Sequence, residues 1–179
     1  MPNIGKARVL IMATDGFEES ELFGPRRILL ERGAGVRVAA PTRTPIQATV
    51  MDDPGRTIRP DLVIADARAD DCDALILPGG VHNPDMLRLH RPAIELIRAF
   101  GAAGKPIGAI CHGPWLLAEA DLLRGRRVAC WPSIATDLRN AGAMIVESPA
   151  VTDGNLVTSR KPEDVDAFTG ALITLIQAH

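Results

Sequence analysis

Short, uninterrupted apolar runs recur along the chain, and a segment with helical spacing follows most of them. Three of the runs are RVLIMAT (8–14), DALILPGG (73–80) and PIGAI (106–110). Apolar runs without polar alternation are typical of strands that are buried on both faces, as in a parallel sheet covered by helices. Apolar residues at helical spacing follow these runs in residues 19–33, 91–105 and 113–123. The alternation predicts a three-layer α/β/α sandwich with a mainly parallel central sheet.

The remaining segments continue this pattern and add two hairpins. VRVAAP (36–41) predicts another strand, and residues 126–147 predict a strand, a helix and a strand in turn. IQATV lies between proline-rich stretches in residues 42–61 and resembles half of a hairpin. A second hairpin is expected around Asp153-Gly154, and a closing helix is expected to begin at Pro162.

Composition restricts the classes of protein to which the chain can belong. Its 179 residues fit one domain, 1–179, and the 46% of hydrophobic residues suffice for a core. The net charge of −2 and the lack of a dense basic block argue against nucleic acid or an anionic membrane as a partner. The sequence shows neither a signal-peptide pattern nor an apolar run of about 20 residues, so we expect a soluble cytoplasmic protein.

The three cysteines and four histidines show no spacing typical of a disulfide framework or a metal site. The cysteine count is odd, no CxxC spacing occurs, and no HExxH motif is present. We therefore expect reduced thiols, no bound metal and no cofactor. Cys72 and Cys130 are expected to be small buried hydrophobic residues, the commonest role of a free cysteine.

Polar or glycine-rich groups follow three of the predicted strands. They are DGFEESE after residues 8–14, LPGGVHNPD after the strand that begins at residue 73, and CHGP after PIGAI. Ligands bind at the carboxyl ends of the strands in open parallel sheets, so the three groups could meet in one active site. The alternative is that they are ordinary strand-to-helix turns.

Cys111 is the strongest single candidate because it lies between a buried strand and a helix. A sharp turn at that place would lift its side chain clear of the sheet, as in a nucleophile elbow. The free N–H groups and the dipole of the following helix would stabilise a thiolate and lower the pKa of the thiol. The same N–H groups could bind an oxyanion. The alternative is a buried structural cysteine.

Gly80 and two glutamates are weaker candidates. The glycines of LPGG let a ligand approach the backbone closely, and the N–H of Gly80 could donate to an oxyanion. Glu18 and Glu21 are three residues apart at the start of a predicted helix, so one of them could exchange a proton with a thiol. The alternative is that both compensate the helix dipole.

The motifs DALILPGG, AICHGPWLL, GFEESE and GNLVTSRKPEDV resemble the PfpI family over essentially the whole chain. These are the intracellular-protease-like members of the superfamily that includes the parkinsonism-associated deglycase. The resemblance implies a flavodoxin-like sandwich in which Cys111 is the nucleophile and His112 lies beside it. It also implies that Glu21 hydrogen-bonds the thiol, with Glu18 nearby. The implied oxyanion donors are the backbone groups of Gly80 and His112.

The resemblance further implies an acidic residue supplied by a neighbouring subunit, which corresponds to Asp85 in NPDML. Side chains that are adjacent on an elbow are expected to diverge, so His112 would need a partner to orient it. VHNPDML predicts a polar loop that could carry Asp85 into a neighbour. The alternative is that Asp85 caps a short helix that starts at DML. The expected assembly is a homodimer or a hexamer with the site near the interface.

Family members are described with several activities. We expect a stress-response enzyme that acts on reactive carbonyls by glyoxalase or protein deglycase chemistry, through a hemithioacetal on Cys111. The expected partner is a small carbonyl substrate, or a peptide or glycated protein. One alternative is an ATP-independent cysteine peptidase. Another is a non-catalytic redox sensor or chaperone that uses oxidised Cys111, because a reactive thiol also oxidises readily.

Overall fold

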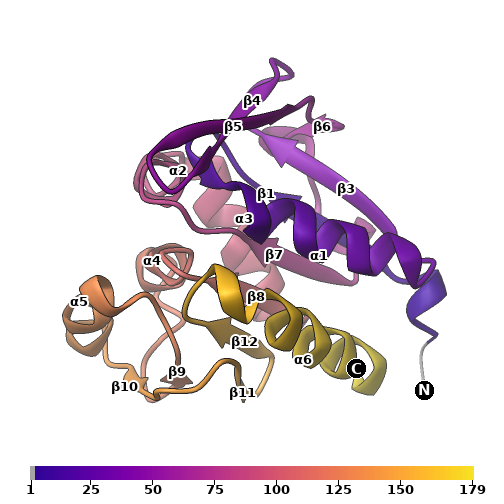
Figure 1. Cartoon of the computed structure of the whole chain (residues 1–179). Coiled ribbons are helices and arrows are strands. Elements are labelled where there is room, and N and C mark those ends of the chain that lie inside the picture. Colours follow the sequence, from indigo (N-terminus) through magenta and orange to yellow (C-terminus); the bar gives the residue numbers. More distant parts are fainter. Residues whose placement is uncertain (1–2) are drawn as a thin grey trace.

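The computed structural model describes residues 3–179, and a seven-stranded sheet forms its centre (Figure 1). The strand order is β11-β12-β8-β7-β1-β3-β6, and all neighbours are parallel except β11 and β12. The bounds are β1 Arg8–Met12, β3 Gly35–Ala40, β6 Leu62–Val63, β7 Ala74–Leu77, β8 Ile107–Ile110, β11 Val151–Asp153 and β12 Leu156–Ser159. The predicted mainly parallel α/β fold is confirmed.

Helices cover both faces of this sheet. Helices α1 and α6 lie side by side on one face, and the shorter helices lie on the other (Figure 1). Their bounds are α1 Glu19–Glu31, α2 His82–Leu87, α3 Arg91–Ala102, α4 Pro114–Glu119, α5 Ala135–Asn140 and α6 Val165–Ala178. Along β1, Val9 and Ile11 join the α1 and α6 core, whereas Leu10 and Met12 join the opposite core. Successive strand side chains point to opposite faces, so burial of both faces explains the continuous apolar run.

Smaller elements complete the fold around the edges of the sheet. A three-stranded sheet contains β2 Phe17–Glu18, β4 Ile46–Val50 and β5 Asp53–Ile58, which confirms the hairpin expected near IQATV. Strands β9 Arg127–Val128 and β10 Met144–Ile145 form a separate parallel pair. The 3₁₀ helices are η1 Ile4–Lys6, η2 Ile64–Asp66, η3 Ala69–Asp71, η4 Pro132–Ile134 and η5 Pro162–Asp164. The last of these leads into α6, so the closing helix begins near Pro162 as predicted.

The segment VHNPDML is a helix, α2, and the prediction of a polar loop is wrong. Its fully buried residue Asn83 donates to the backbone carbonyls of Pro78 and Gly79 and accepts from the N–H of Thr14. Leu87 is also fully buried. These contacts hold the segment against the ends of β1 and β7, where a free loop would leave buried polar groups unpaired.

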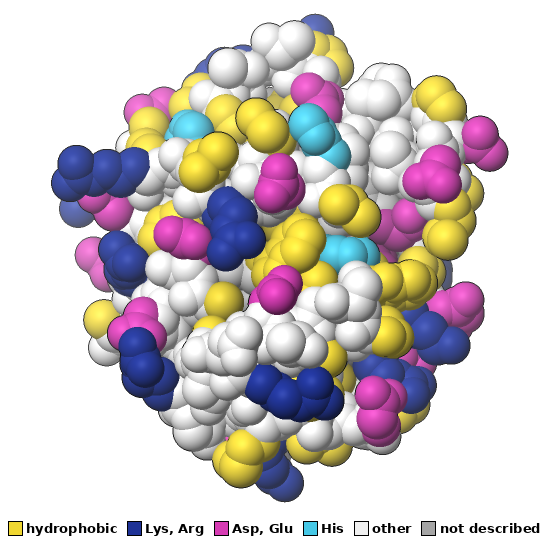
Figure 2. Space-filling view, turned by 90° about the vertical axis from the view of Figure 1, so that its left-hand side faces the viewer, with side chains coloured by type: hydrophobic (Ala, Val, Ile, Leu, Met, Phe, Trp, Pro, Cys, Tyr) yellow, Lys and Arg dark blue, Asp and Glu magenta, His cyan; other side chains and the backbone are white. Residues whose placement is uncertain are grey.

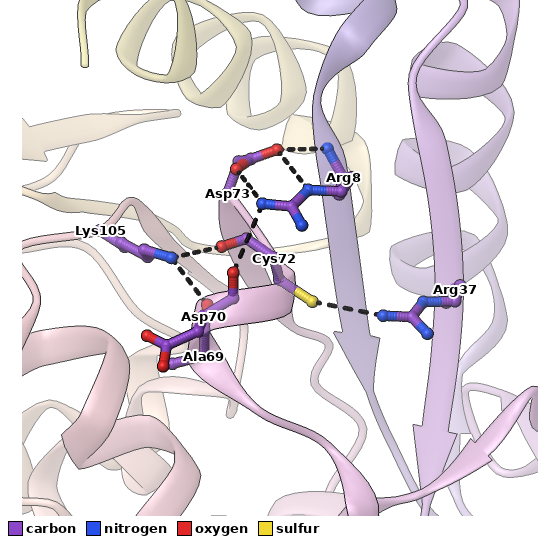
Figure 3. A network of polar contacts seen from close by, with 7 residues as sticks. All are labelled: Arg8, Arg37, Ala69, Asp70, Cys72, Asp73 and Lys105. Atoms are coloured by element: carbon purple, nitrogen blue, oxygen red, sulfur yellow. Dashed lines mark hydrogen bonds and ion pairs between the residues drawn. The ribbon is translucent and has the colours of Figure 1, made fainter.

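The amino ends of the central strands are held by a network of charged side chains (Figure 3). Arg8 pairs with Asp73 at 2.9 Å, and Lys105 donates to the carbonyls of Ala69 and Cys72 at 2.7 and 2.8 Å. The thiol of Cys72 contacts Arg37 at 3.8 Å and is buried. Cys130 is also buried, so both cysteines are packed as predicted. Within residues 3–179, no helix is long and apolar enough to cross a membrane.

Candidate active site

The backbone at Cys111 forms the sharp turn that its sequence position predicts. Cys111 follows β8, precedes α4 and has a φ of 61°, an uncommon conformation for a residue other than glycine. Its N–H donates to the carbonyl of Ser159 at 3.0 Å, and its own carbonyl accepts from the N–H of Trp131 at 2.9 Å. A side chain at Gly113 would collide with the carbonyl of Leu77. Backbone of such strain persists only where its surroundings hold it, and it is often found at functional sites.

The thiol of Cys111 is only 5% exposed, and its pKa is raised. Burial is the main cause, because it disfavours the charged thiolate, and the charge of nearby Glu21 adds to the effect. The N–H groups of Gly80 and His112 act in the opposite direction and favour the thiolate. The expectation of a lowered pKa is therefore wrong, because the effect of burial on the pKa outweighs that of the two N–H groups. Both predicted oxyanion donors nevertheless lie at the sulfur.

Glu21 lies beside the cysteine in the interior of the protein. Its side chain is fully buried, and its Oε2 accepts from the N–H of Gly79 at 2.8 Å. Gly79 separates the two groups: a Cβ added there would lie 2.6 Å from Glu21 Oε2 and 2.7 Å from Cys111 Cβ. Burial raises the pKa of Glu21 to about 8, so its carboxyl group is protonated at neutral pH. Its Oε1 has no hydrogen-bond partner among the residues described here.

Glu18 occupies a different position from Glu21, although the two start the same helix. Its Oε2 accepts from the N–H of Met51 at 3.1 Å, which ties the β4–β5 turn to the start of α1. Its side chain is 7% exposed, and burial raises its pKa. Met51 has a φ of 56° and is itself exposed. Glu18 therefore fixes the β4–β5 turn at the edge of the site, whereas Glu21 lies next to the thiol.

His112 contacts the thiol directly. Its Nδ1 lies 3.2 Å from the Sγ of Cys111, so these adjacent side chains converge and the prediction that they diverge is wrong. The left-handed backbone at Cys111 accounts for the difference, because it redirects the Cys111 side chain. Burial lowers the pKa of His112, so the imidazole is neutral at pH 7. A neutral imidazole can accept a proton from the thiol.

Three side chains that sequence reasoning did not assign to the site hold the imidazole in place. Trp131 stacks on its ring at 5.7 Å between centroids, and Trp115 meets it edge to face at 5.3 Å. The Nε2 atom lies 3.5 Å from the Oγ of Ser133. A local motif could not reveal Ser133, because it follows β9 and only the tertiary fold brings it to the histidine.

A pocket of about 210 Å³ opens above the thiol at the carboxyl edge of the sheet. Its lining comprises Glu18, Met51, Asp52, Gly80, Val81, Cys111, Trp131 and Pro162. Figure 2 shows the face at the carboxyl ends of the strands, where a central hydrophobic patch is bordered by histidine, acidic and Lys or Arg side chains. The volume suits a small carbonyl compound or the end of one side chain, with Cys111 at its base.

Asp85 was predicted to belong to the site, but within one chain it does not contact Cys111. It lies in the first turn of α2, and its side chain is exposed. Within residues 3–179, its carboxylate forms no hydrogen bond or ion pair with another side chain. It is not the capping residue of α2, because the helix begins three residues earlier. Asp85 thus remains available to another molecule.

Known proteins resemble this chain over nearly its whole length. Residues 7–175 match the model of the DJ-1/PfpI family. The chain is 39% identical to a deglycase from Pyrococcus abyssi, with 95% of this chain and 99% of that protein covered. It is 34% identical to deglycase PfpI from Pyrococcus furiosus, over the same shares of the two chains. A two-domain protein from Anabaena variabilis with a DJ-1/ThiJ/PfpI-like domain superposes with a TM-score of 0.91 at 31% identity, covering 96% of this chain and 48% of that one.

Proposed function

Because this chain belongs to the DJ-1/PfpI family, we propose that it is a cysteine-dependent enzyme that acts on reactive carbonyls, either free or as adducts on proteins. Full-length relatives named deglycases support this reaction class. The observation that carries the proposal is the arrangement of Cys111, protonated Glu21 and neutral His112 below a pocket of small volume. This arrangement contains a nucleophile, a proton donor and a base.

The reaction on methylglyoxal begins when the sulfur of Cys111 adds to the aldehyde carbon. The thiol proton passes to His112, and the N–H groups of Gly80 and His112 stabilise the developing oxyanion. Protonation of that oxygen gives a hemithioacetal. Moving a proton from the former aldehyde carbon to the neighbouring carbon, by way of an enediol, gives a lactoyl thioester. Water then releases lactate and restores the thiol, so no oxidant or reductant is consumed.

For an adduct on a protein amine, the first step is a displacement at a saturated carbon. The sulfur attacks the carbon that bears nitrogen and hydroxyl, a C–S bond forms, and the C–N bond breaks. The departing amine needs a proton, and the neutral carboxyl of Glu21 can supply it. The resulting hemithioacetal is the one formed from free methylglyoxal, so both substrates share all later steps.

Lactate formation from methylglyoxal by the purified protein tests the proposal. Lactate should appear with the wild-type chain, and Cys111→Ala should reduce it to the background rate. Cys72→Ala is the matched control, because Cys72 is a buried thiol at the opposite edge of the sheet and should leave turnover unchanged. Cleavage of an unmodified peptide without lactate formation would support a peptidase instead. Oxidation of Cys111 without turnover of either substrate would support a redox sensor.

Asp85 is proposed to complete the site of a second copy of the chain. Its exposed carboxylate has no side-chain partner among the described residues 3–179, and its α2 helix packs against α4, which follows His112. A carboxylate from a neighbour could stabilise the imidazolium that forms when His112 accepts the thiol proton. The assembly that this requires is a homodimer or a higher assembly of dimers.

Subunit complementation tests the role of Asp85. Cys111→Ala and Asp85→Ala proteins should each be inactive, and should regain activity after they are dissociated, mixed and reassociated. Random pairing in a dimer places intact Cys111 and intact Asp85 together in about a quarter of the sites. Asp53→Ala changes an exposed aspartate outside the pocket lining, so this protein should be active without being mixed with a second variant. Full activity of Asp85→Ala by itself would remove this residue from the mechanism.

A further inference from the structure

The pocket above Cys111 carries a distribution of charge that the proposed reaction does not require. Two of its lining side chains, Glu18 and Asp52, are carboxylic acids. Apart from the thiol, the other lining residues are apolar side chains or glycine backbone. No lysine or arginine is among the lining residues that the structure describes. Among the residues that line the pocket, a substrate therefore meets acidic groups and no cation.

A third carboxylate lies within electrostatic range of the pocket. The charge of Glu163 raises the pKa of both Glu18 and Glu21, so its field reaches the site. The side chain of Glu163 is 73% exposed, and the ammonium group of Lys161 lies 4.0 Å from it. Because this ion pair is exposed and its N–O distance is long, Lys161 neutralises the charge of Glu163 only in part.

Two guanidinium groups on neighbouring segments are already paired with other carboxylates. Arg56 pairs with Glu19 at 3.0 Å, and Arg160 pairs with Asp164 at 2.9 Å. His112, behind the thiol, is neutral at pH 7 because burial lowers its pKa. Within residues 3–179, these two guanidinium groups are therefore not free to receive an anionic substrate.

The geometry points to a pocket that selects neutral or positively charged carbonyl substrates and rejects those that carry a carboxylate, with Asp52 as the specificity-determining residue at its mouth. The inference rests on the proposed function, since it concerns which carbonyl compounds reach Cys111. Asp52 is exposed and lines the pocket, whereas Glu18 is buried and holds the Met51 turn. An approaching molecule therefore meets the charge of Asp52 first.

Binding of a carboxylate normally uses an arginine or lysine, and repulsion is an effective way to discriminate against the wrong substrate. Neutral dicarbonyls enter such a pocket unhindered. Adducts on protein segments that carry further lysine or arginine residues are attracted by the acidic mouth. The same field favours departure of lactate, because the product is an anion while the substrate is neutral.

Alkylation of Cys111 measures this selection without any turnover. Iodoacetamide and iodoacetate have the same reacting carbon and iodide leaving group but differ by one negative charge. Mass mapping gives the rate of each reagent at Cys111, and the rate for the urea-unfolded chain corrects for intrinsic reactivity. After this correction, iodoacetamide should react about tenfold faster than iodoacetate in the folded protein at low salt. Added salt should reduce the ratio, because it screens the field.

Variants of Asp52 test whether this residue causes the difference in alkylation rate between the two reagents. Asp52→Asn should lower the corrected ratio by about twofold to threefold, and Asp52→Lys should lower it further. Asp71→Asn is the matched control: this exposed aspartate lies before β7, at the opposite edge of the sheet, and should leave the ratio unchanged.

Two results would overturn the inference: a corrected ratio near one in the wild-type protein, or a ratio that is the same in wild type, Asp52→Asn and Asp52→Lys. A protein that forms no lactate but shows the expected ratios would refute the proposed function and leave the selectivity of the pocket intact. The two ideas therefore fail separately.

Discussion

Replacing Glu21 with glutamine is expected to lower turnover of a dicarbonyl substrate by about 10²–10⁴-fold and, at the same time, to make the fold more stable at pH 8. The two effects have one cause. The carboxyl group is positioned to move a proton at Cys111, and that position is fully buried, where an ionised carboxylate is unfavourable. Glutamine keeps the shape and can still accept from the N–H of Gly79, but it does not exchange a proton.

The sign of the stability effect follows from the raised pKa of Glu21. Its pKa is about 8 in the folded chain against 4.5 for the ordinary side chain, so the folded state holds its proton when the unfolded state has lost it. Glu21 therefore decreases stability as pH rises from about 4.5 to about 8, by up to roughly 1.4 kcal/mol per pH unit. Glu21→Gln removes this dependence, so the gain should be small at pH 5 and several kcal/mol at pH 8.

Urea unfolding at a series of pH values measures the effect. Glu19→Gln is a useful control on the same helix, because Arg56 holds the pKa of Glu19 below its usual range. Its carboxylate therefore adds stability above the unfolded pKa, and the glutamine variant should lose a little stability at neutral pH. A Glu21→Gln protein with the pH dependence of the wild type would show that Glu21 is already ionised in the folded state.

The fold could be predicted because its determinants are local. Strands β1, β7 and β8 are largely continuous apolar runs, and the segment that follows each of them contains glycine or proline, so the order of layers follows from the sequence. The turn at Cys111 could be predicted for the same reason. The separate pairing of β9 with β10 could not be predicted from the sequence, because the pairing of short strands depends on the tertiary packing around them.

The chemistry of the site was harder to predict, because burial is not a local property. The spacing of Glu18 and Glu21 indicates a shared helix face but not that one contacts the thiol while the other binds the Met51 turn. The pKa of Cys111 was predicted with the wrong sign, because its helix end was visible in the sequence and its surroundings were not. Ser133 comes to His112 from a distant segment that carries no motif.

Replacing Gly79 with alanine is expected to destabilise the fold by about 3 kcal/mol or more and to abolish the reactivity of the site. A Cβ there would lie 2.6 Å from Oε2 of Glu21, 2.7 Å from Cβ of Cys111 and 2.9 Å from the carbonyl oxygen of Ile110. The last two atoms belong to the strained turn and to the central strand β8, so they cannot move aside as the end of a flexible side chain could. Over-packing of this kind forces shifts in the backbone itself.

Gly170→Ala is the matched control, because a Cβ at this position of α6 has no neighbour within 4 Å. Alanine in that helix should stabilise the chain by about 0.5–1 kcal/mol. Urea midpoints compare the two variants, and iodoacetamide alkylation of Cys111 reports on the site in any Gly79→Ala protein that folds. The double variant Gly79→Ala/Gly170→Ala offers a more stable background if the single variant does not fold. A Gly79→Ala protein with wild-type stability and alkylation rate would contradict the close approach of Glu21 to Cys111, on which the proton transfer in this site depends.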